Sequence, residues 1–534
     1  MGATFRKSMA WLHTWSGVVI GGLLFAIFWM GTLSVFDREI DRWMAPMTRL
    51  QVPAAAISID ASARPIAERL AATATQWTFV LPNERMPSLR LQWRDAAGKN
   101  QSRYFDPATG ATLPATGTHG GSGFLYPFHY RLHISFLDIG YWLVGLATMA
   151  MLVALVSGVV IHKKIFVEFF TFRPHKQIQR ASLDLHNLSS VLALPFHFTI
   201  ALSGLMIFFA IYFPGGWQAA YDGDRRAFNA EASDTFQRPL AGQPGTLGSL
   251  DAMVAQARGA WGGGLVSQVR VHHQGDAGSY VEVRRSIADR VTKNAQTLYF
   301  DAGSGAELAR SEVKPVKNAL NFITGLHEIQ FRHWTLRWLY FLAGLSGCVM
   351  IATGFLFWLE ARRAGHAKKG LAGVRVVEAM TIGSVTGIVI ATLAFFVINR
   401  LLPLGSSLAG QDRAALEMWV FYLTWLASFG HAAWRRADPA TQPARRAWRE
   451  QCTAIAVLAV AAVLLNALTT GDPLFKTLAQ GYWPVAGMDL MLLLGAGLAL
   501  WTARRVGRSA TRRVRAASLH PASATTATES AHRV

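Results

Sequence analysis

Histidines at the ends of apolar segments are the residues of this sequence best suited to chemistry. His13 and His186 lie at the start of an apolar run, and His133 and His327 lie just before one. Haem b binds two neutral imidazoles from opposing helices, whose nitrogens lie ~4 Å apart across the iron. We therefore expect two facing couples, His13 with His186 and His133 with His327, one on each side of a membrane.

Two other histidines are alternative ligands. His162 ends an apolar run, and His197 lies inside one, where an ionisable side chain usually marks a functional site. If one helix continues from His186 to His197, their spacing puts both on one face at depths ~16 Å apart. Either His162 or His197 can replace His13 or His186. For each of the six histidines, the alternative is an interfacial residue that is hydrogen-bonded to a headgroup or a carbonyl.

His129 and His333 have three open interpretations. His129 precedes His133 by one helical turn, and His333 follows His327 by less than two turns. They hydrogen-bond haem propionates, or they line an extracytoplasmic site, or they are ordinary surface residues.

An internal duplication positions these histidines, because similar short sequences recur at nearly constant offsets. They are Leu12-His13 and Leu185-His186 at 173 residues, Gly31 and Gly204 at 173, Leu132-His133 and Leu326-His327 at 194, Ser157-Gly158 and Thr353-Gly354 at 196, and two Tyr-Phe-Asp-x-x-x-Gly turns at 195. The repeated unit is a helix, a soluble α+β segment, a histidine and a second helix. Such repeats pack about a pseudo-two-fold axis, so equivalent histidines can face one another.

The composition indicates a membrane protein. Of 534 residues, 51% are hydrophobic and 16% are charged, which is more apolar than one water-soluble core needs. A spanning helix needs ~20 mainly apolar residues. Eight segments are expected to span: 14–36, 140–161, 188–213, 337–359, 377–402, 415–433, 452–470 and 485–502.

Basic residues predict the orientation. Lys and Arg concentrate in every second loop, so both termini are expected in the cytoplasm. These loops also account for most of the net charge of +20, which does not gather along one groove, and we therefore expect no nucleic-acid binding. Cys348 and Cys452 have no paired spacing, which argues against thiolate metal sites and disulfides.

The predicted fold is a polytopic α-helical membrane protein with two inserted extracytoplasmic α+β domains. In order, we expect a helix at 1–36, a soluble domain at 37–132, a helix at 133–162, a cytoplasmic loop at 163–185, a helix at 186–213, a second soluble domain at 214–326, a helix at 327–360, a four-helix region at 371–505 and a tail at 506–534. The tail is rich in Ala, Ser, Thr and Arg and is predicted to be disordered.

Several motifs together resemble the PepSY-associated transmembrane-helix family. They are Leu12-His13-x-Trp15-x-Gly17, Ile161-His162-Lys163-Lys164-Ile165-Phe166, Phe169-Phe170-Thr171-Phe172-Arg173-Pro174, Leu185-His186-Asn187 and Leu194-Pro195-Phe196-His197. The resemblance covers about residues 5 to 365. Some members of that family are inner-membrane, di-haem ferric-siderophore reductases.

The resemblance implies a four-helix, haem-bearing core in a bacterial inner membrane, with two PepSY-like domains facing the periplasm. It implies two haems b and an oxidoreductase that reduces a ferric siderophore or another ferric chelate. No Gly-rich dinucleotide fingerprint follows a predicted strand. Electrons are therefore expected from quinol or from a separate flavoprotein on the cytoplasmic side.

Two other functions stay open at this stage. The chain can be a non-redox module whose PepSY-like domains bind peptides or modulate an envelope protease, which predicts no haem. It can also be a transporter whose histidines bind Fe, Cu or Zn directly, although the scarcity of Asp and Glu in the spans argues against a cation path. The region 371–505 can serve packing, quinol access or partner binding.

Overall fold

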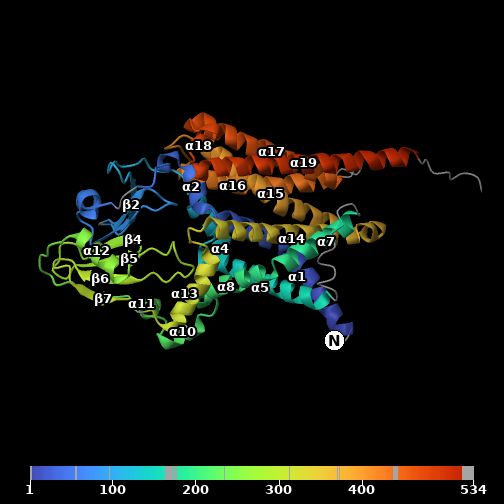
Figure 1. Ribbon diagram of the computed structural model, residues 1–534. Coiled ribbons are helices and arrows are strands. Elements are labelled where there is room, and N and C mark those ends of the chain that lie inside the picture. The colour runs from blue at the N-terminus through green and yellow to red at the C-terminus, as the bar shows by residue number, and fades with distance from the viewer. Residues whose placement is uncertain are drawn as a thin grey trace, which may run out of the picture. The chain divides into compact units, whose positions relative to one another are not determined.

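The structure is a computed structural model that describes residues 3–53, 57–95, 97–162, 172–173, 177–233, 235–311, 313–369, 371, 373–436 and 443–519. The chain divides into two compact units. The first comprises Met1–Glu360 with Leu404–Ala414, and the second comprises Ala361–Pro403 with Ala415–Val534. Figure 1 labels most of their helices and strands.

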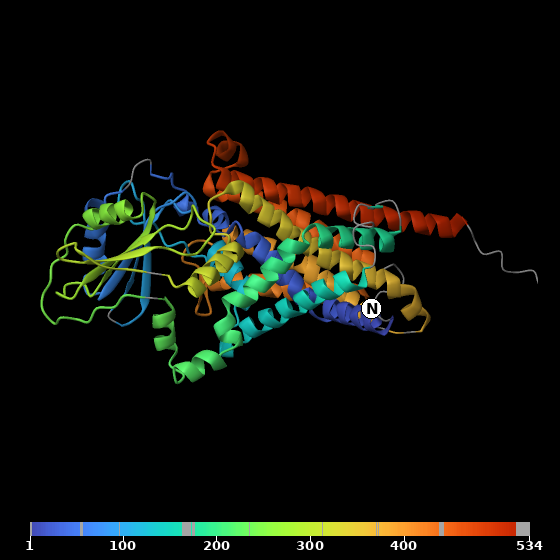
Figure 2. The same ribbon diagram turned by 60° about the horizontal axis from the view of Figure 1, so that its bottom comes forward.

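Long apolar helices of the first unit form a bundle (Figures 1 and 2). They are α1 (Ala3–Ser34), α5 (Ile139–Ile161), the consecutive pair α7 (Ile178–Leu192) and α8 (Leu194–Ile207), and α14 (Trp334–Lys368). Within the first repeat, α1 packs against α5. Between the repeats, α5 packs against α8, and Gly21 of α1 lies against the ring of Phe355 of α14. The two copies of the repeated unit are therefore interlocked.

The third apolar segment is broken, where the sequence predicted one straight helix over 188–213. Helices α7 and α8 are bent by 66° to each other at Ala193. Pro195 lies in the first turn of α8, where its missing N–H and fixed φ favour the start of a new helix. His186 and His197 therefore lie on different helices, and the expected common face does not exist.

Short helices link the bundle to the strands. In the first repeat they are α2 (Asp37–Met44), the 3-10 turn η1 (Pro46–Thr48), the π-helical turn η3 (Gly121–Leu125), α4 (Tyr126–Arg131) and the 3-10 turn η4 (Phe136–Asp138). In the second they are α9 (Phe209–Tyr212), α10 (Gly215–Ala220), α11 (Arg225–Ser233) and α13 (Pro315–Glu328). Both α4 and α13 end at a residue in the left-handed conformation, Leu132 and Ile329 respectively.

The two soluble segments share one antiparallel sheet. The first contributes β1 (Gln76–Val80), β2 (Leu89–Arg94) and β3 (Asn100–Phe105). The second contributes β4 (Val266–His272), β5 (Tyr280–Arg285), β6 (Thr297–Asp301) and β7 (Glu307–Arg310). Their order is β3-β2-β1-β4-β5-β6-β7, and β1 pairs with β4 so that Trp77 lies opposite Val271 and Phe79 opposite Val269. The sequence predicted two separate domains, whereas the structure joins them through this strand pair.

One face of the sheet carries a single hydrophobic core. Alternate residues of both halves, such as Phe79, Leu91, Val269 and Phe300, are buried there with 0% exposure. Two helices cover this face, α3 (Arg64–Leu70) from the first segment and α12 (Leu250–Ala260) from the second (Figure 2). Strands β2 and β3 pair antiparallel, as do β6 and β7, and Gly110 and Gly305 adopt the left-handed φ that the two Tyr-Phe-Asp-x-x-x-Gly turns require.

The two covering helices cap each other reciprocally. The carboxylate of Asp251 accepts hydrogen bonds from the Ser58 hydroxyl (2.5 Å) and the Ile59 N–H (2.7 Å), at the π-helical turn η2 (Ile59–Ala63) that leads into α3. The carboxylate of Asp60 accepts from the Ser249 hydroxyl (2.6 Å) and from two backbone N–H groups at the start of α12. These bonds lower the pKa of Asp60, although burial opposes them. The pseudo-two-fold relation of the repeats is thus present in side-chain detail.

Removing either cap should destabilise the joined sheet. Because each carboxylate satisfies helix N-terminal donors of the other repeat, Asp60→Ala and Asp251→Ala should each cost about 1–2 kcal/mol. Hydrogen exchange of the sheet amides measures this loss. Glu68→Ala is the control, since Glu68 is half exposed and pairs only with Arg64 among the described residues. Equal exchange rates in all three variants would contradict the capping role.

The described residues of the second unit form helices and no strands. They are α15 (Gly373–Leu401), most of α16 (Arg413–Arg436), α17 (Pro443–Thr470), α18 (Leu474–Ala479) and α19 (Trp483–Leu519). Helix α17 packs against both α15 and α19. The side chain of Gln451 joins three of these helices, since it accepts from Thr386 and donates to the carbonyl of Ser428. The two-residue strands β8 (Ser407–Leu408) and β9 (Gln411–Asp412) belong to the first unit.

Six described helices are long and apolar enough to cross a membrane, or seven if the bent pair α7–α8 is one span. Helix α16 covers the predicted span 415–433 but is not among them. Helix α19 continues to Leu519, so residues 506–519 are helical where the sequence predicted a disordered tail. The rest of that tail, 520–534, and residues 163–171 and 174–176 of the predicted loop 163–185 lie outside the described residues.

Candidate functional site

Two pairs of imidazoles face each other inside the bundle. The first pair, His13 of α1 and His186 of α7, has ring centroids 6.3 Å apart. We call it the far-side pair, because α1 begins there and reaches the sheet only at its other end. The second pair, His129 of α4 and His327 of α13, has ring centroids 5.9 Å apart and planes inclined by 30°. We call it the sheet-side pair.

Both separations suit two ligands of one haem iron. Each Fe–N bond is ~2.0 Å and each ring centroid lies ~1.15 Å beyond its nitrogen, so two axial imidazoles have centroids ~6.3 Å apart. The observed distances are 6.3 and 5.9 Å. The residues present therefore fit bis-histidine ligation at two levels of the bundle.

Each of the four imidazoles is held in the same way through Nδ1. His13, His129 and His186 donate Nδ1–H to the backbone carbonyls of Ala154 (2.9 Å), Ile27 (2.8 Å) and Met350 (2.8 Å). His327 Nδ1 lies 2.9 Å from the Ser203 hydroxyl and is also bonded to the carbonyl of Ile200. A carbonyl acceptor fixes the proton on Nδ1, which leaves Nε2 as the lone-pair nitrogen that a metal needs.

A glycine four residues after each accepting carbonyl seats the ring. The pairs are Ile27 with Gly31, Ala154 with Gly158, Ile200 with Gly204, and Met350 with Gly354. A Cβ at Gly31 would lie 2.6 Å from the His129 ring, and a Cβ at the other three would lie 3.0–3.2 Å from its histidine. The glycines let each imidazole lie directly on the neighbouring helix. The spacings between the copies, 173 and 196 residues, are those of the sequence duplication.

The four Nε2 atoms have no hydrogen-bond partner within the part of the chain that the structure describes. Burial lowers the pKa of His129, and it lowers the pKa of His327 to about 3 with the neighbouring His129 adding to the effect. Both sheet-side imidazoles are therefore neutral at ordinary pH. A neutral imidazole is the form that coordinates iron.

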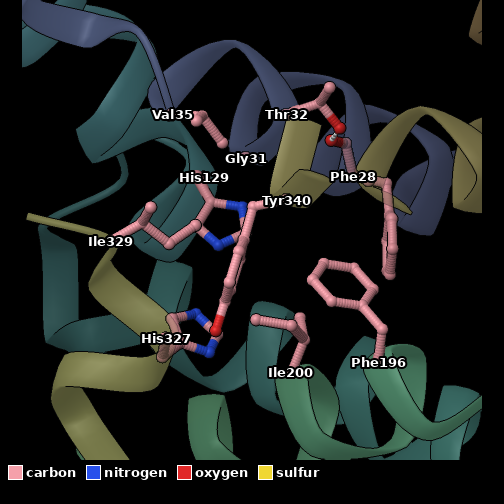
Figure 3. Close-up of a pocket in the computed structure, with 11 residues that line it drawn as sticks. Phe28, Gly31, Thr32, Val35, His129, Phe196, Ile200, His327, Ile329 and Tyr340 are labelled. Atoms are coloured by element: carbon pink, nitrogen blue, oxygen red, sulfur yellow. Dashed lines mark hydrogen bonds between the residues drawn. The ribbon is translucent and has the colours of Figure 1, made fainter. Parts of the chain in front are cut away.

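A cavity of about 60 Å³ adjoins the sheet-side pair (Figure 3). In Figure 3 the two imidazoles lie at one end of it and the rings of Phe28 and Phe196 at the other, with Tyr340 between them. Gly31, Thr32, Val35, Ile200, Ile329 and Gly344 complete the lining. The lining is almost wholly apolar, as a haem pocket requires. The cavity has room for about two water molecules, so a porphyrin needs the lining rings to turn aside.

The structure brings together only part of the predicted site. His13 faces His186 as expected, and His327 faces His129 where the sequence paired it with His133. His133 instead stacks on the ring of Phe124 at 4.8 Å, and its Nε2 is hydrogen-bonded to the Phe124 carbonyl at 2.8 Å. The left-handed backbone of Leu132 and His133 turns the chain away after α4. The predicted couple of His133 with His327 is therefore replaced by His129 with His327.

The two alternative ligands lie outside both pairs. His162 follows α5, and its Nε2 lies 3.1 Å from the Asn187 amide. His197 is fully buried between the two pairs, where Phe28 packs on its ring at 5.9 Å. Its Nε2 is hydrogen-bonded to the Ala343 carbonyl at 3.2 Å. Neither faces a second histidine among the described residues, so each fits a packing role better than ligation.

His333 and His431 also lie outside the two histidine pairs. His333 is exposed before α14, and its carbonyl accepts the N–H of Arg337. His431 of the second unit has both ring nitrogens engaged, Nε2 with Glu450 at 2.9 Å and Nδ1 with the Gln451 amide at 3.3 Å. Across the described residues no group of three or more His, Cys, Asp or Glu side chains is arranged to hold a metal ion.

Comparison with known proteins agrees with this architecture. The family described as the PepSY-associated TM region matches residues 10–361 of the 534-residue chain. The chain belongs to this family. As a PepSY-associated transmembrane protein with several apolar helices, it is a multi-pass membrane protein. All four paired histidines and all four glycines lie within the matched residues, whereas α15 to α19 lie beyond them.

A curated relative is similar to most of the chain. The uncharacterized protein PA4219 of Pseudomonas aeruginosa is 27% identical over 406 residues, which is 72% of this chain and 95% of that protein. Its printed name gives no activity. The similarity therefore extends over most of this PepSY-associated protein but gives no information about its chemistry, which has to be inferred from the arrangement of the histidines.

Proposed function

We propose that this chain is an inner-membrane, haem-containing electron-transfer protein that reduces a ferric siderophore or another ferric chelate in the periplasm. One observation carries the proposal. Two imidazole pairs with centroids 6.3 and 5.9 Å apart have all four rings oriented by Nδ1 hydrogen bonds and seated on glycines. Interfacial histidines that merely anchor helices have no need for this fourfold arrangement. The site residues of the proposal are His13 and His186, and His129 and His327.

The proposed topology has eight membrane spans. Seven are the apolar helices with the bent pair α7–α8 counted as one, and the eighth is α16, which is less apolar. Both termini and the basic loops are cytoplasmic, and the seven-stranded sheet is periplasmic. The far-side pair then lies near the cytoplasm and the sheet-side pair near the periplasm. On α1, His13 and the carbonyl of Ile27 that holds His129 are fourteen residues apart, or ~21 Å of helix. The two pairs thus divide the membrane into two electron-transfer steps.

Haem b, when bound, supplies a one-electron Fe(III)/Fe(II) couple at each level. The protein contributes four fixed neutral ligands, a low-dielectric surrounding and exclusion of water. His197, Phe28 and Phe196 fill the bundle between the pairs and keep that space dry. A dry interior lowers the reorganisation that accompanies each electron transfer.

The overall reaction balances with one electron for each iron. A donor on the cytoplasmic side, either quinol or a reduced flavoprotein, loses electrons, and quinol releases two protons for its two electrons. Each electron converts one chelated Fe(III) to Fe(II) in the periplasm. Siderophores hold Fe(II) far more weakly than Fe(III), so reduction releases the iron. The basic cytoplasmic loops offer a docking surface for an acidic donor protein.

A stopped-flow experiment tests this function. The detergent-purified protein is reduced with a stoichiometric amount of dithionite and mixed anaerobically with ferric citrate or a ferric hydroxamate, with a coloured Fe(II) chelator present. The reduced haem band is expected to disappear as about one Fe(II) per haem is captured. A protein that holds haem but stays reduced in the presence of every ferric chelate would exclude the reductase. A folded protein without haem would favour the peptide-binding alternative.

A further inference from the structure

Arg337 is a fully buried cation near the sheet-side pair. It begins the apolar part of α14 and has 0% exposure. Its Nη2 donates to the Glu39 carboxylate at 2.6 Å and to the carbonyl of Val35 at 2.9 Å. The rings of Phe36 and Trp334 lie 4.6 and 4.9 Å from its guanidinium carbon. Burying a guanidinium is costly, so its position calls for a function.

One of the residues that hold Arg337 also borders the cavity. Val35 accepts the Arg337 hydrogen bond through its carbonyl and lines the cavity through its side chain. Tyr340, one turn after Arg337 on α14, lines the cavity beside His129 and His327 (Figure 3). Arg337 is therefore connected to the sheet-side pocket through Val35, and through Tyr340 on its own helix.

One donor of Arg337 is left over. Its Nε–H is buried and has no acceptor among the described residues. Two guanidinium groups, from Arg337 and Arg85, lower the pKa of Glu39 to about 2, although burial alone would raise it. The Glu39 carboxylate is therefore ionised, and it pairs with both guanidinium groups, since Arg85 Nη2 lies 3.0 Å from the same Glu39 oxygen that Arg337 contacts. A buried donor without an acceptor is destabilising, and an anionic ligand would supply the missing acceptor.

We infer that Arg337 binds a carboxylate at the outer edge of the sheet-side pocket, and that this carboxylate is a propionate of the haem held by His129 and His327. The inference rests on the proposed function. A carboxylate is planar and accepts hydrogen bonds from guanidinium N–H groups with good geometry. The buried positive charge also stabilises the more electron-rich, reduced state of that haem. A carboxylate of the ferric chelate itself is the other source of the same chemistry.

The experiment is a redox titration of the purified holoprotein followed by absorption. Arg337→Gln removes the cation, and the reduced-to-oxidised ratio of the sheet-side haem at a fixed potential should fall about tenfold, or ~59 mV. Glu39→Gln leaves the cation without its counter-charge, and the ratio should rise. The opposite signs distinguish an electrostatic role from a structural one, because damage to the fold moves both variants alike. Arg337→Lys keeps the charge and should stay closer to wild type than Arg337→Gln.

The haem of the far-side pair is the internal control, since its potential should not change in any variant. A shift of Arg337→Gln that appears only after iron-free citrate is added would identify the chelate as the source of the carboxylate. Unchanged potentials, or shifts of one sign in both Arg337→Gln and Glu39→Gln, would overturn the inference alone. A wild-type protein without haem would overturn it together with the proposed function.

Discussion

Replacing His129 with alanine is expected to halve the haem content of the protein. The structure places His129, and no other described histidine, opposite His327. Without it one axial ligand of the sheet-side haem is missing, and a haem held by one histidine is bound weakly and becomes high-spin. Pyridine haemochrome analysis should fall from about two haems per chain to about one. The ferric-chelate reduction rate should fall to the uncatalysed background.

The matched control is His133→Ala. His133 lies four residues away, stacks on Phe124 and bonds to its carbonyl, so its loss should leave both haems in place. Low-temperature electron paramagnetic resonance can identify the haem that remains. The far-side rings are inclined by 81° and the sheet-side rings by 30°, and perpendicular axial ligands give the more anisotropic ferric signal. A result in which His133→Ala loses haem and His129→Ala does not would reverse the pairing drawn from the structure.

Replacing His13 or His186 with alanine is expected to stop electron transfer across the membrane while the sheet-side haem stays bound. Each supplies one half of the far-side pair, and the two pairs are separated by ~21 Å along α1. Vesicles that contain the protein, with dithionite inside and ferricyanide outside, measure this transfer. The rate in either variant should fall to the leak of protein-free vesicles.

His162→Ala is the control for the far-side pair. His162 is at the same end of the bundle, but its Nε2 faces Asn187 and not a second imidazole. Its transfer rate should match that of the wild type. Full loss of transfer in His162→Ala, with normal transfer in His13→Ala, would show that the far-side ligands are misassigned.

The sequence alone could predict the repeat and much of the site. The offset of 173 residues that joins His13 to His186 also joins Gly31 to Gly204, and the offset of 196 joins Gly158 to Gly354. The structure shows why both the glycines and the histidines are duplicated, since each glycine seats an imidazole. A site made from duplicated helices has to repeat both components.

The sequence could not predict that His129 faces His327, because the two repeats were matched to each other at their Leu-His dipeptides. Leu132-His133 matches Leu326-His327 in letters, yet α4 ends at Leu132 whereas α13 ends at Ile329. These two left-handed C-caps are 197 residues apart, close to the 198 that separate His129 from His327. Aligning the helix ends would have found the pair, but left-handed leucine and isoleucine caps have no sequence signature.

The other differences between prediction and structure have separate causes. The bend between α7 and α8 follows from Pro195, whose position in an apolar run of full length did not by itself reveal a break. The helix that continues to Leu519 contains alanine and arginine, which are good helix formers even where apolar contacts are few. The pairing of β1 with β4 joins segments that are almost two hundred residues apart. No local pattern encodes such a contact.

The most direct test of the account is a haem count on the wild-type protein. The detergent-purified chain is measured by a dithionite-reduced minus oxidised spectrum and by pyridine haemochrome quantification against protein concentration. The account predicts sharp reduced bands and about two haems b per chain. A folded protein that remains colourless after expression with ample haem would contradict it.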